Sequence, residues 1–227
     1  MREERGFGRF FLLFHFFYLS MIGLLVSNNY IQMYLFWEGV GAASYLLIGF
    51  WYQREAARRA ALKAFLVNRV GDAGFLLGVL LLAAAAGTVN FGELFGRLDG
   101  LRPGVVVAAA FLLAWGAAAK SAQFPLFIWL PDAMEGPTPT SALMHAATMV
   151  TAGVFLLARS WPLLEAAPAV LRCLAAVGAV TALGGAIVAA TKTDLKRILA
   201  YSTVSHLGLM TMAIGVKAVP VAILHLV

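Results

Sequence analysis

Long apolar runs alternate with short polar segments along almost the whole chain. Each run has about 18 residues or more, the length that an α-helix needs to cross the hydrocarbon core of a bilayer. The pattern predicts seven membrane spans and the start of an eighth near Val219. The fold class that follows is an all-α polytopic membrane protein. The spans are expected at residues 10–27, 31–52, 62–86, 104–130, 138–160, 168–190 and 196–216.

The composition agrees with a membrane protein and argues against a soluble one. Hydrophobic residues make up 62% of the 227 residues and charged residues only 12%, and the mean hydropathy is +0.86. A soluble domain carries roughly 25% charged residues, so this chain has too few of them to cover its surface. The net charge of +6 does not indicate nucleic-acid binding, because the basic residues are distributed according to the membrane.

No sequence signature of redox or nucleotide chemistry is present. The chain has no CxxC pair, no P-loop and no His/carboxylate cluster at metal-binding spacing. Cys173 is the one cysteine, which excludes an internal disulfide and a cysteine-ligated cluster. We expect Cys173 to pack as a small apolar residue and expect no cofactor or metal in this chain.

The loops between the expected spans divide the basic residues unequally, with ten on one side of the membrane and five on the other. Because basic residues concentrate in cytoplasmic loops, we expect the N-terminus and the loops at residues 53–63, 131–137 and 191–197 to face the cytoplasm. The expected location is a bacterial plasma (inner) membrane. The ten are Arg2, Arg5, Arg9, Arg54, Arg58, Arg59, Lys63, Lys192, Lys196 and Arg197, and the five are Arg97, Arg102, Arg159, Arg172 and Lys217.

The N-terminal end of the chain predicts a complete membrane span, and the C-terminal end predicts an incomplete one. The apolar run after Arg9 extends to about Val26 without a small-x-small cleavage site, so it predicts a first span and not a signal peptide. The eighth span has completed only about two turns at Val227. A helix that stopped there would leave polar backbone groups in lipid, so we expect a fragment, or a chain that other protein completes.

Lys120 is the most unusual residue within a predicted span. A charged side chain at the centre of a membrane helix costs about 2.5–3.5 kcal/mol on insertion scales and usually marks a pathway. Pro125 cannot donate to the carbonyl of Ser121, so the helix is expected to break just after the lysine. Such a break beside a buried ammonium is typical of ion sites in transporters. The alternative is a lysine that only extends to the membrane surface.

Two acidic residues also lie within spans. Glu38 has small neighbours that permit another helix to approach closely, and it is either a switchable site or a carboxylate that a structural partner neutralises. Asp72 follows Arg69 at a spacing of i, i+3, so the two can pair on one helix face. We expect this pair roughly two turns from the cytoplasmic end of its span, as a functional or a structural ion pair.

His145 is the principal histidine candidate. Ser141, His145 and Thr148 fall on one helix face, and an unperturbed pKa near 6.5 suits a proton relay. The alternative is a core histidine with its hydrogen bonds satisfied. His15 is expected in the core or at an interface. His206, which has serines nearby, and His225, near the end of the chain, are intermediate between a core and a relay residue.

Several long motifs resemble a known family, membrane subunit L (mitochondrial subunit 5) of NADH:quinone oxidoreductase, which is respiratory complex I. They cover nearly the whole chain. The motifs are Phe36-Trp-Glu-Gly-Val-Gly-Ala-Ala-Ser-Tyr-Leu-Leu-Ile-Gly-Phe50, Asn68-Arg-Val-Gly-Asp72, Lys120-Ser-Ala-Gln123, Trp129-Leu-Pro-Asp-Ala-Met-Glu-Gly-Pro-Thr-Pro139, His145-Ala-Ala-Thr-Met-Val-Thr-Ala-Gly153 and Asp194-Leu-Lys-Arg-Ile-Leu-Ala-Tyr-Ser-Thr203.

The resemblance implies an antiporter-like architecture of two inverted five-helix repeats, each with one broken helix. Residues 1–161 would form the first repeat and residues 162–227 the start of the second. It also implies a proton-relay role for Glu38, Lys120 and His145, with Asp72 near the cytoplasmic entrance and His225 as a further relay residue. NADH, FMN, iron–sulfur clusters and quinone are then expected in partner membrane and peripheral subunits.

The alternative is the large subunit of a multisubunit sodium/proton antiporter, which shares the fold. Gly39-Val-Gly41 and Thr151 favour complex I, whereas His206 and Leu209 lean towards the antiporter. For either protein we expect Glu38 and Lys120 to form a switchable charge pair. When Glu38 moves or is neutralised, Lys120 would release its proton towards Ser141, His145 and Thr148.

Overall fold

The computed structural model describes residues 6–226, and within this range it is built of helices joined by short turns. The α-helices are α1 (Phe7–Leu25), α2 (Tyr30–Ile48), α3 (Glu55–Ala86), α4 (Phe91–Phe95), α5 (Pro103–Lys120), α6 (Thr138–Ala142), α7 (Met149–Arg159), α8 (Trp161–Glu165), α9 (Pro168–Thr191), α10 (Leu195–Gly215) and α11 (Val219–Leu226). Short 3₁₀-helices occupy Leu98–Gly100, Leu126–Trp129 and Asp132–Glu135, and a π-helix occupies Leu143–Ala147.

Local sequence signals explain where several helices begin and end. The side chain of Asn29 accepts a hydrogen bond from the backbone N–H of Gln32, and Asp194 does the same for Arg197. Both satisfy N–H groups that a helix start leaves free. Pro103 begins α5 at a position where a missing N–H costs nothing. Gly87 ends α3 in a left-handed conformation with φ 70°.

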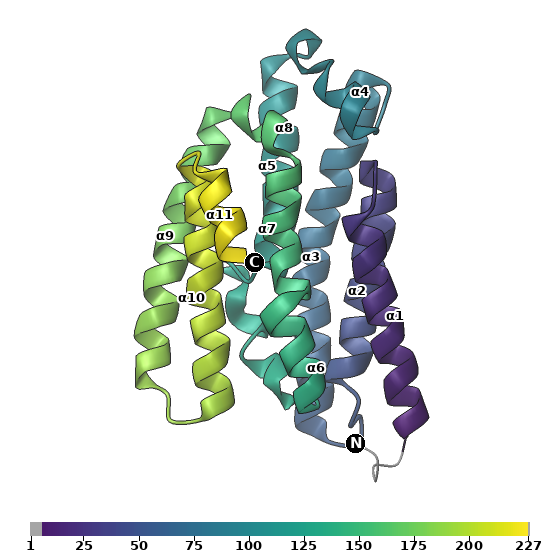
Figure 1. Ribbon diagram of the computed structural model, residues 1–227, viewed down its shortest axis with the longest axis vertical. Coiled ribbons are helices and arrows are strands. Elements are labelled where there is room, and N and C mark those ends of the chain that lie inside the picture. The colour runs from purple at the N-terminus through teal and green to yellow at the C-terminus, as the bar shows by residue number, and fades with distance from the viewer. Residues whose placement is uncertain (1–5, 227) are drawn as a thin grey trace.

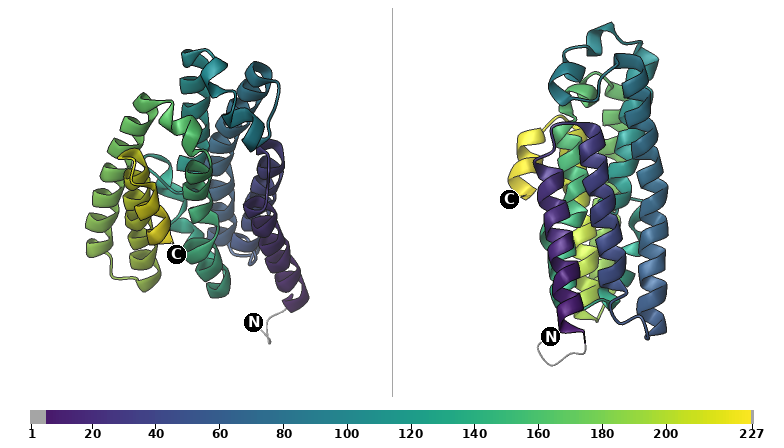
Figure 2. Two further views of the ribbon diagram at one scale, coloured as in Figure 1. Left: turned by 45° about the horizontal axis from the view of Figure 1, so that its top comes forward. Right: turned by 90° about the vertical axis from the view of Figure 1, so that its right-hand side faces the viewer.

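The long helices run roughly along one axis and form a bundle (Figures 1 and 2). Helices α1 and α2 lie at one side, the pair α9 and α10 at the other, and α3, α5 and α7 between them (Figure 1). Glycines allow α9 and α10 to approach closely, because a Cβ at Gly178 would clash with the backbone of Met212, and one at Gly208 with that of Ala182.

Six of the helical segments in the described range are long and apolar enough to span a membrane. They confirm six of the seven predicted spans and the polytopic fold class. The remaining predicted span, at 31–52, corresponds to α2, which has 19 residues and packs between α1 and α3. Its polar residues, including Gln32 and Glu38, lower its hydropathy. The six are Phe7–Leu25, Glu55–Ala86, Pro103–Lys120, Thr138–Arg159, Pro168–Thr191 and Leu195–Gly215.

The structure corrects three predicted spans. The expected span at 104–130 is α-helical only as far as Lys120, where α5 ends, because the chain there turns into an irregular segment before the 3₁₀-helix at Leu126–Trp129. Helix α3 begins at Glu55, seven residues before the expected position 62, because the polar segment before the apolar run also has strong helix formers. The expected span at 138–160 is not one regular helix. It consists of α6, the π-helix at Leu143–Ala147 and α7, and the apolar pattern carries no sign of that change.

The connections lie at the two ends of the bundle in the way that alternating spans require. The start of α1, the turn between α2 and α3, the segment before α6 and the turn between α9 and α10 all lie at one end (Figure 1). These are the segments expected on the cytoplasmic side. Arg2 and Arg5 belong to the predicted basic set but lie outside the described residues, and the orientation in the membrane remains a prediction.

Candidate functional site

Lys120 is the last residue of α5 and is completely buried, with 0% of its surface exposed. Its Nζ lies 3.4 Å from Oδ2 of Asp72 on α3 and 5.6 Å from the ring centroid of Trp37 on α2. A Cβ at Gly41 would come within 3.0 Å of the same Nζ. The absence of a side chain at Gly41 therefore gives the ammonium group room against α2.

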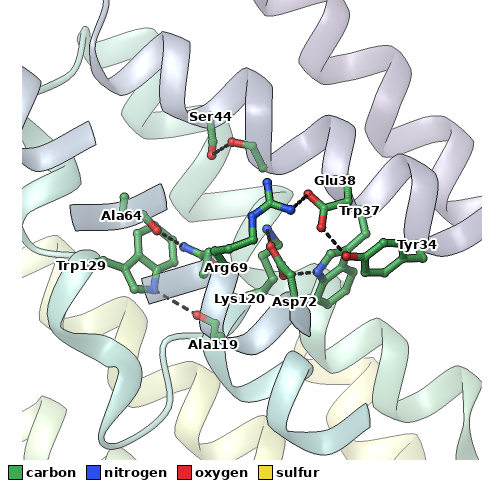
Figure 3. Close-up of polar contacts among 12 residues, drawn as sticks. Tyr34, Trp37, Glu38, Ser44, Ala64, Arg69, Asp72, Ala119, Lys120 and Trp129 are labelled. Carbon is green, nitrogen blue, oxygen red and sulfur yellow. Dashed lines mark hydrogen bonds and ion pairs between the residues drawn. The ribbon is translucent and has the colours of Figure 1, made fainter. Parts of the chain in front are cut away.

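Asp72 is the buried partner of Lys120 and is 2% exposed. The indole Nε1 of Trp37 donates to its Oδ1 over 2.6 Å, and Nζ of Lys120 donates to Oδ2 (Figure 3). A buried charge pair is stable only when close geometry and further hydrogen bonds offset the loss of water. The carboxylate meets this condition because each of its oxygens has a donor.

Glu38 forms a second ion pair nearer the edge of the bundle. Its Oε2 lies 2.6 Å from Nη1 of Arg69, and its Oε1 accepts a hydrogen bond of 2.6 Å from the hydroxyl of Tyr34. The side chains of Glu38 and Arg69 are 21% and 44% exposed. The guanidinium also lies 4.8 Å from the ring centroid of Phe65. This pair is thus more accessible than the pair of Asp72 and Lys120.

The structure corrects both pairings expected from the sequence. Lys120 contacts Asp72 instead of Glu38, and Arg69 contacts Glu38 instead of Asp72. The i, i+3 spacing made contact between Arg69 and Asp72 possible but did not decide it. Asp72 points towards α5, whereas the long arginine extends towards α2, where it stays partly exposed (Figure 3).

The four charged groups lie in one region, where three helices meet (Figure 3). Negative and positive groups alternate across α2, α3 and α5, in the order Glu38, Arg69, Asp72 and Lys120. Sequence reasoning missed Tyr34 and Trp37 as donors. Tyr34 precedes Glu38 by four residues and was detectable from helical spacing, whereas the contact between Trp37 and Asp72 depends on how two helices pack.

The helix break after Lys120 is confirmed, since α5 ends at this residue. Side chains satisfy backbone groups around the break: Oγ of Ser121 donates to the carbonyl of Val150 over 2.7 Å, and Nε1 of Trp129 donates to that of Ala119 over 3.0 Å. Nε2 of Gln123 donates to the carbonyl of Ser121 over 2.8 Å. Irregular backbone at membrane depth is stable only when its polar groups are satisfied in this way.

His145 lies in the π-helix, is 3% exposed, and has its ring centroid 6.2 Å from that of Trp129. Neither ring nitrogen has a hydrogen-bond partner among the described residues. The expected polar stripe does not supply one. Ser141 donates to the carbonyl of Pro137 and Thr148 to that of Leu143, because hydroxyls in a helix readily bond to their own backbone.

An unpartnered buried imidazole is costly, because losing its hydrogen bonds to water costs about 1–3 kcal/mol for each group. Such a group usually indicates an ordered water molecule or a functional role. Trp129 lies between the break and His145, since it bonds to Ala119 and faces the imidazole. Sequence reasoning did not select Trp129 as a site residue, although its position in the long motif was visible.

The other selected residues lie away from this region. His225 pairs with His206, with Nδ1 of His206 3.0 Å from Nε2 of His225, and both are exposed on the described part of the chain. His15 is exposed rather than in the core and contacts the carbonyl of Phe11. Cys173 is exposed, which corrects the expectation of a packed side chain. Cys173 lines a cavity together with residues of α5, including Phe111.

Within residues 6–226, no three His, Cys, Asp or Glu side chains gather closely enough to hold a metal ion. The ionisable groups of the buried site are two carboxylates, a lysine, an arginine and an imidazole. Such a set can accept, hold and release protons.

Close packing between α5 and α7 stabilises the helix break after Lys120, so a larger side chain at this contact should destabilise the protein. A Cβ at Gly153 would clash with Oγ of Ser121 and with the carbonyl oxygen of Ala117. We expect Gly153→Ala to lower the free energy of unfolding by about 1–3 kcal/mol, as overpacked sites do. Thermal unfolding of the membrane protein in detergent measures this effect.

Gly184→Ala is the matched control, since a Cβ at this α9 position meets no atom within 4 Å. It should be neutral or stabilise the helix by up to about 1 kcal/mol. Equal stability of Gly153→Ala and Gly184→Ala would contradict the close contact between α5 and α7.

A family described as NADH:quinone oxidoreductase/Mrp antiporter, TM matches residues 27–227. NAD(P)H-quinone oxidoreductase chain 5 of Synechocystis sp. is 53% identical over 232 residues, which cover 100% of this chain and 34% of that protein. The chloroplastic NAD(P)H-quinone oxidoreductase subunit 5 of Cryptomeria japonica is 50% identical over 233 residues, covering 100% and 31%. The chain thus spans about a third of the length of these curated relatives.

Two solved structures have the same fold. A chain of the Mrp complex from Dietzia sp. DQ12-45-1b superposes with a TM-score of 0.90 at 36% identity, covering 94% of this chain and 24% of that one. A chain of the membrane-bound sulfane sulfur reductase, an archaeal respiratory membrane complex, gives 0.88 at 27% identity, covering 94% and 45%. The chain therefore belongs to the NADH:quinone oxidoreductase/Mrp antiporter family of transmembrane proteins, and its resemblance to subunit L, the mitochondrial subunit 5, is confirmed.

Proposed function

We propose that this chain is part of a proton-translocating membrane subunit of an NADH:quinone oxidoreductase. Its curated relatives at 50–53% identity carry the name of subunit 5 of that enzyme. The electron carriers, namely NADH, FMN, iron–sulfur clusters and quinone, would be bound by partner membrane and peripheral subunits. This chain would supply a proton path that the redox reaction drives from elsewhere in the complex.

The observation that carries this proposal is a fully buried lysine at the break of a membrane helix, paired with a carboxylate. Lysine can lose its proton when its surroundings change, whereas arginine remains charged. The pair of Lys120 and Asp72 is therefore the group best placed to load and release a proton. Arg69 would be the fixed charge that keeps Glu38 ionised and close by.

The proposed step depends on the order of the four charges. While Asp72 is ionised, its contact with Lys120 favours the ammonium. When Asp72 gains a proton or moves away, Lys120 loses its compensating charge and releases a proton in the direction of His145. His145 is a suitable acceptor because both of its ring nitrogens lack a partner in the described structure.

The energies are sufficient for such a step. Moving one charge against 100 mV requires about 2.3 kcal/mol. Removing one member of a buried ion pair typically costs about 3–5 kcal/mol. Rearrangement of a single buried pair can therefore match the work of transporting one proton, provided that the redox subunits supply the energy.

The domain division also belongs to the proposal. Residues 1–161 would form the first antiporter-like repeat, with α5 as its broken helix, and residues 162–227 would belong to the second, inverted repeat. His225 would then be a relay residue of the second repeat. The contact of α9 mainly with α10, beside a bundle of α1, α2, α3, α5 and α7, supports this division.

The test uses the membrane complex that contains this chain, reconstituted in liposomes. Addition of NADH and quinone should acidify the liposome lumen, and His145→Gln should reduce proton transport severalfold while quinone reduction continues. A His15→Gln control, at an exposed position, should leave transport unchanged. Normal transport in His145→Gln would remove His145 from the path.

The same liposome assay distinguishes the proposed function from that of a sodium/proton antiporter. A chain of the solved Mrp complex is 36% identical to this chain. The proposal expects proton transport that requires quinone reduction and does not require sodium. Sodium-driven proton exchange without quinone reduction would overturn it in favour of the antiporter.

A further inference from the structure

A small cavity of about 240 Å³ opens between α1, α2 and α3 at the end of the bundle that is expected to face the cytoplasm. Two arginines and two tyrosines line it together with apolar side chains, and none of the described residues that line it is acidic. It lies outside the buried charge site. The residues that matter here are Arg9, Arg58, Tyr45, Tyr52, Leu13 and Leu46.

Arg9 is held in a fixed position at this cavity. Its Nη2 donates to the carbonyl of Phe50 over 2.9 Å, and its guanidinium carbon lies 4.7 Å from the ring centroid of Phe50 and 5.1 Å from that of Tyr52. A guanidinium has five N–H donors, so most of them are available for a ligand. An arginine held in this way is well suited to bind phosphate oxygens.

Arg58 has no ion-pair partner among the described residues, unlike its neighbour Arg59, which pairs with Glu55. The guanidinium groups of Arg9 and Arg58, neither of which pairs with a carboxylate within residues 6–226, therefore line one cavity. Such an arrangement repels cations and favours an anion. A larger cavity of about 520 Å³ at the same end of the bundle is also basic, but it differs in that two acidic residues, Glu135 and Asp194, stand among its four basic ones, Arg54, Lys192, Lys196 and Arg197.

The surroundings indicate an anion that is attached to a hydrocarbon chain. Leu13 and Leu46 lie about one turn deeper along their helices than Arg9 and Phe50, and exposed leucines, including Leu62 and Leu66, continue the apolar surface on α3. Tyrosines at the boundary between charged and apolar residues are typical of the level of lipid headgroups.

We propose that this cavity binds the phosphodiester headgroup of an anionic phospholipid from the cytoplasmic leaflet. Arg9 and Arg58 would contact the phosphate, the hydroxyl of Tyr52 would donate to it, and one acyl chain would lie against Leu13 and Leu46. Basic residues at a membrane surface gain about 1 kcal/mol each from anionic lipid. The site would bind lipid at the α1–α3 side of the bundle, and its existence does not depend on proton transport.

The experiment titrates the detergent-purified membrane complex with short-chain phosphatidylglycerol and counts bound lipids by native mass spectrometry. Arg58→Gln is the primary variant, because this side chain makes no hydrogen bond or ion pair with the residues of the range 6–226. We expect it to weaken the binding of one phosphatidylglycerol about fivefold, the factor that corresponds to about 1 kcal/mol. Arg9→Gln should have an effect at least as large.

The controls decide whether the site is specific. Arg58→Lys, which retains the charge, should bind within about twofold of wild type. Arg172→Gln, an exposed arginine on α9 at the opposite end of the bundle, should have no effect. An equal loss in Arg172→Gln and Arg58→Gln would overturn the proposal, as would equal retention of zwitterionic phosphatidylcholine by the wild-type complex. Complete displacement of the lipid by millimolar inorganic phosphate would show a free-anion site and would also overturn it.

Discussion

Lys120→Met is expected to abolish most proton translocation while the complex still assembles and reduces quinone. Methionine fills a similar volume but cannot carry a proton, so the buried site loses the group proposed to load and release it. Fluorescence quenching of a pH-sensitive dye in liposomes measures the translocation, and NADH oxidation measures the electron transfer. Translocation is expected to fall at least tenfold at an unchanged amount of assembled complex.

Lys63→Met is the matched control for this result. Lys63 also pairs with a carboxylate, since its Nζ lies 2.7 Å from Oδ2 of Asp132, but both side chains are about 40% exposed. A surface ion pair of this kind contributes about 0–1 kcal/mol, so translocation and stability should change little. Unchanged translocation in Lys120→Met, with the complex intact, would show that Lys120 is not part of the proton path.

Asp72→Asn is expected to reveal which carboxylate neutralises Lys120. The substitution leaves a buried ammonium without its ion-pair partner, which costs about 3–5 kcal/mol of unfolding free energy. Adding Lys120→Met should recover much of that loss, because the unpaired charge then disappears. The coupling energy of this double-mutant cycle, measured by thermal unfolding of the purified complex, should exceed about 2 kcal/mol.

The second cycle combines Glu38→Gln with Lys120→Met. Glu38 is more exposed and pairs with Arg69, so its coupling to Lys120 should stay below about 1 kcal/mol, while its coupling to Arg69 should be larger. A stronger coupling of Lys120 to Glu38 than to Asp72 would instead support the pairing expected from the sequence. The two cycles thus test the exchange of partners directly.

The sequence alone determined the membrane helices and the residues that matter within them. Apolar runs must be helical in lipid because no water is present to satisfy the backbone, so most spans could be predicted. Pro125 predicted the end of α5 for the same kind of local reason, a missing N–H. The cost of burying charge singled out Glu38, Asp72 and Lys120 without any knowledge of their neighbours.

The tertiary structure decided what those residues contact. Helical spacing states which side chains share a face, but the rotation and separation of neighbouring helices determine which groups meet across them. Lys120 reaches Asp72 because Gly41 leaves space on α2 and Trp37 holds the carboxylate on α3. His145 likewise lies in a π-helix that the apolar pattern did not predict.

The difference between what the sequence determines and what the tertiary structure decides has one physical origin. Backbone hydrogen bonding and hydrophobicity act within a few residues, so the sequence records them directly. Ion pairs between helices depend on distances of a few ångströms that close packing sets, with Ala119 seated against Gly71 as one example at this site. The sequence therefore determined that this membrane bundle holds buried charges beside a broken helix, whereas the packing of α2, α3 and α5 decided that Lys120 pairs with Asp72 and Arg69 with Glu38.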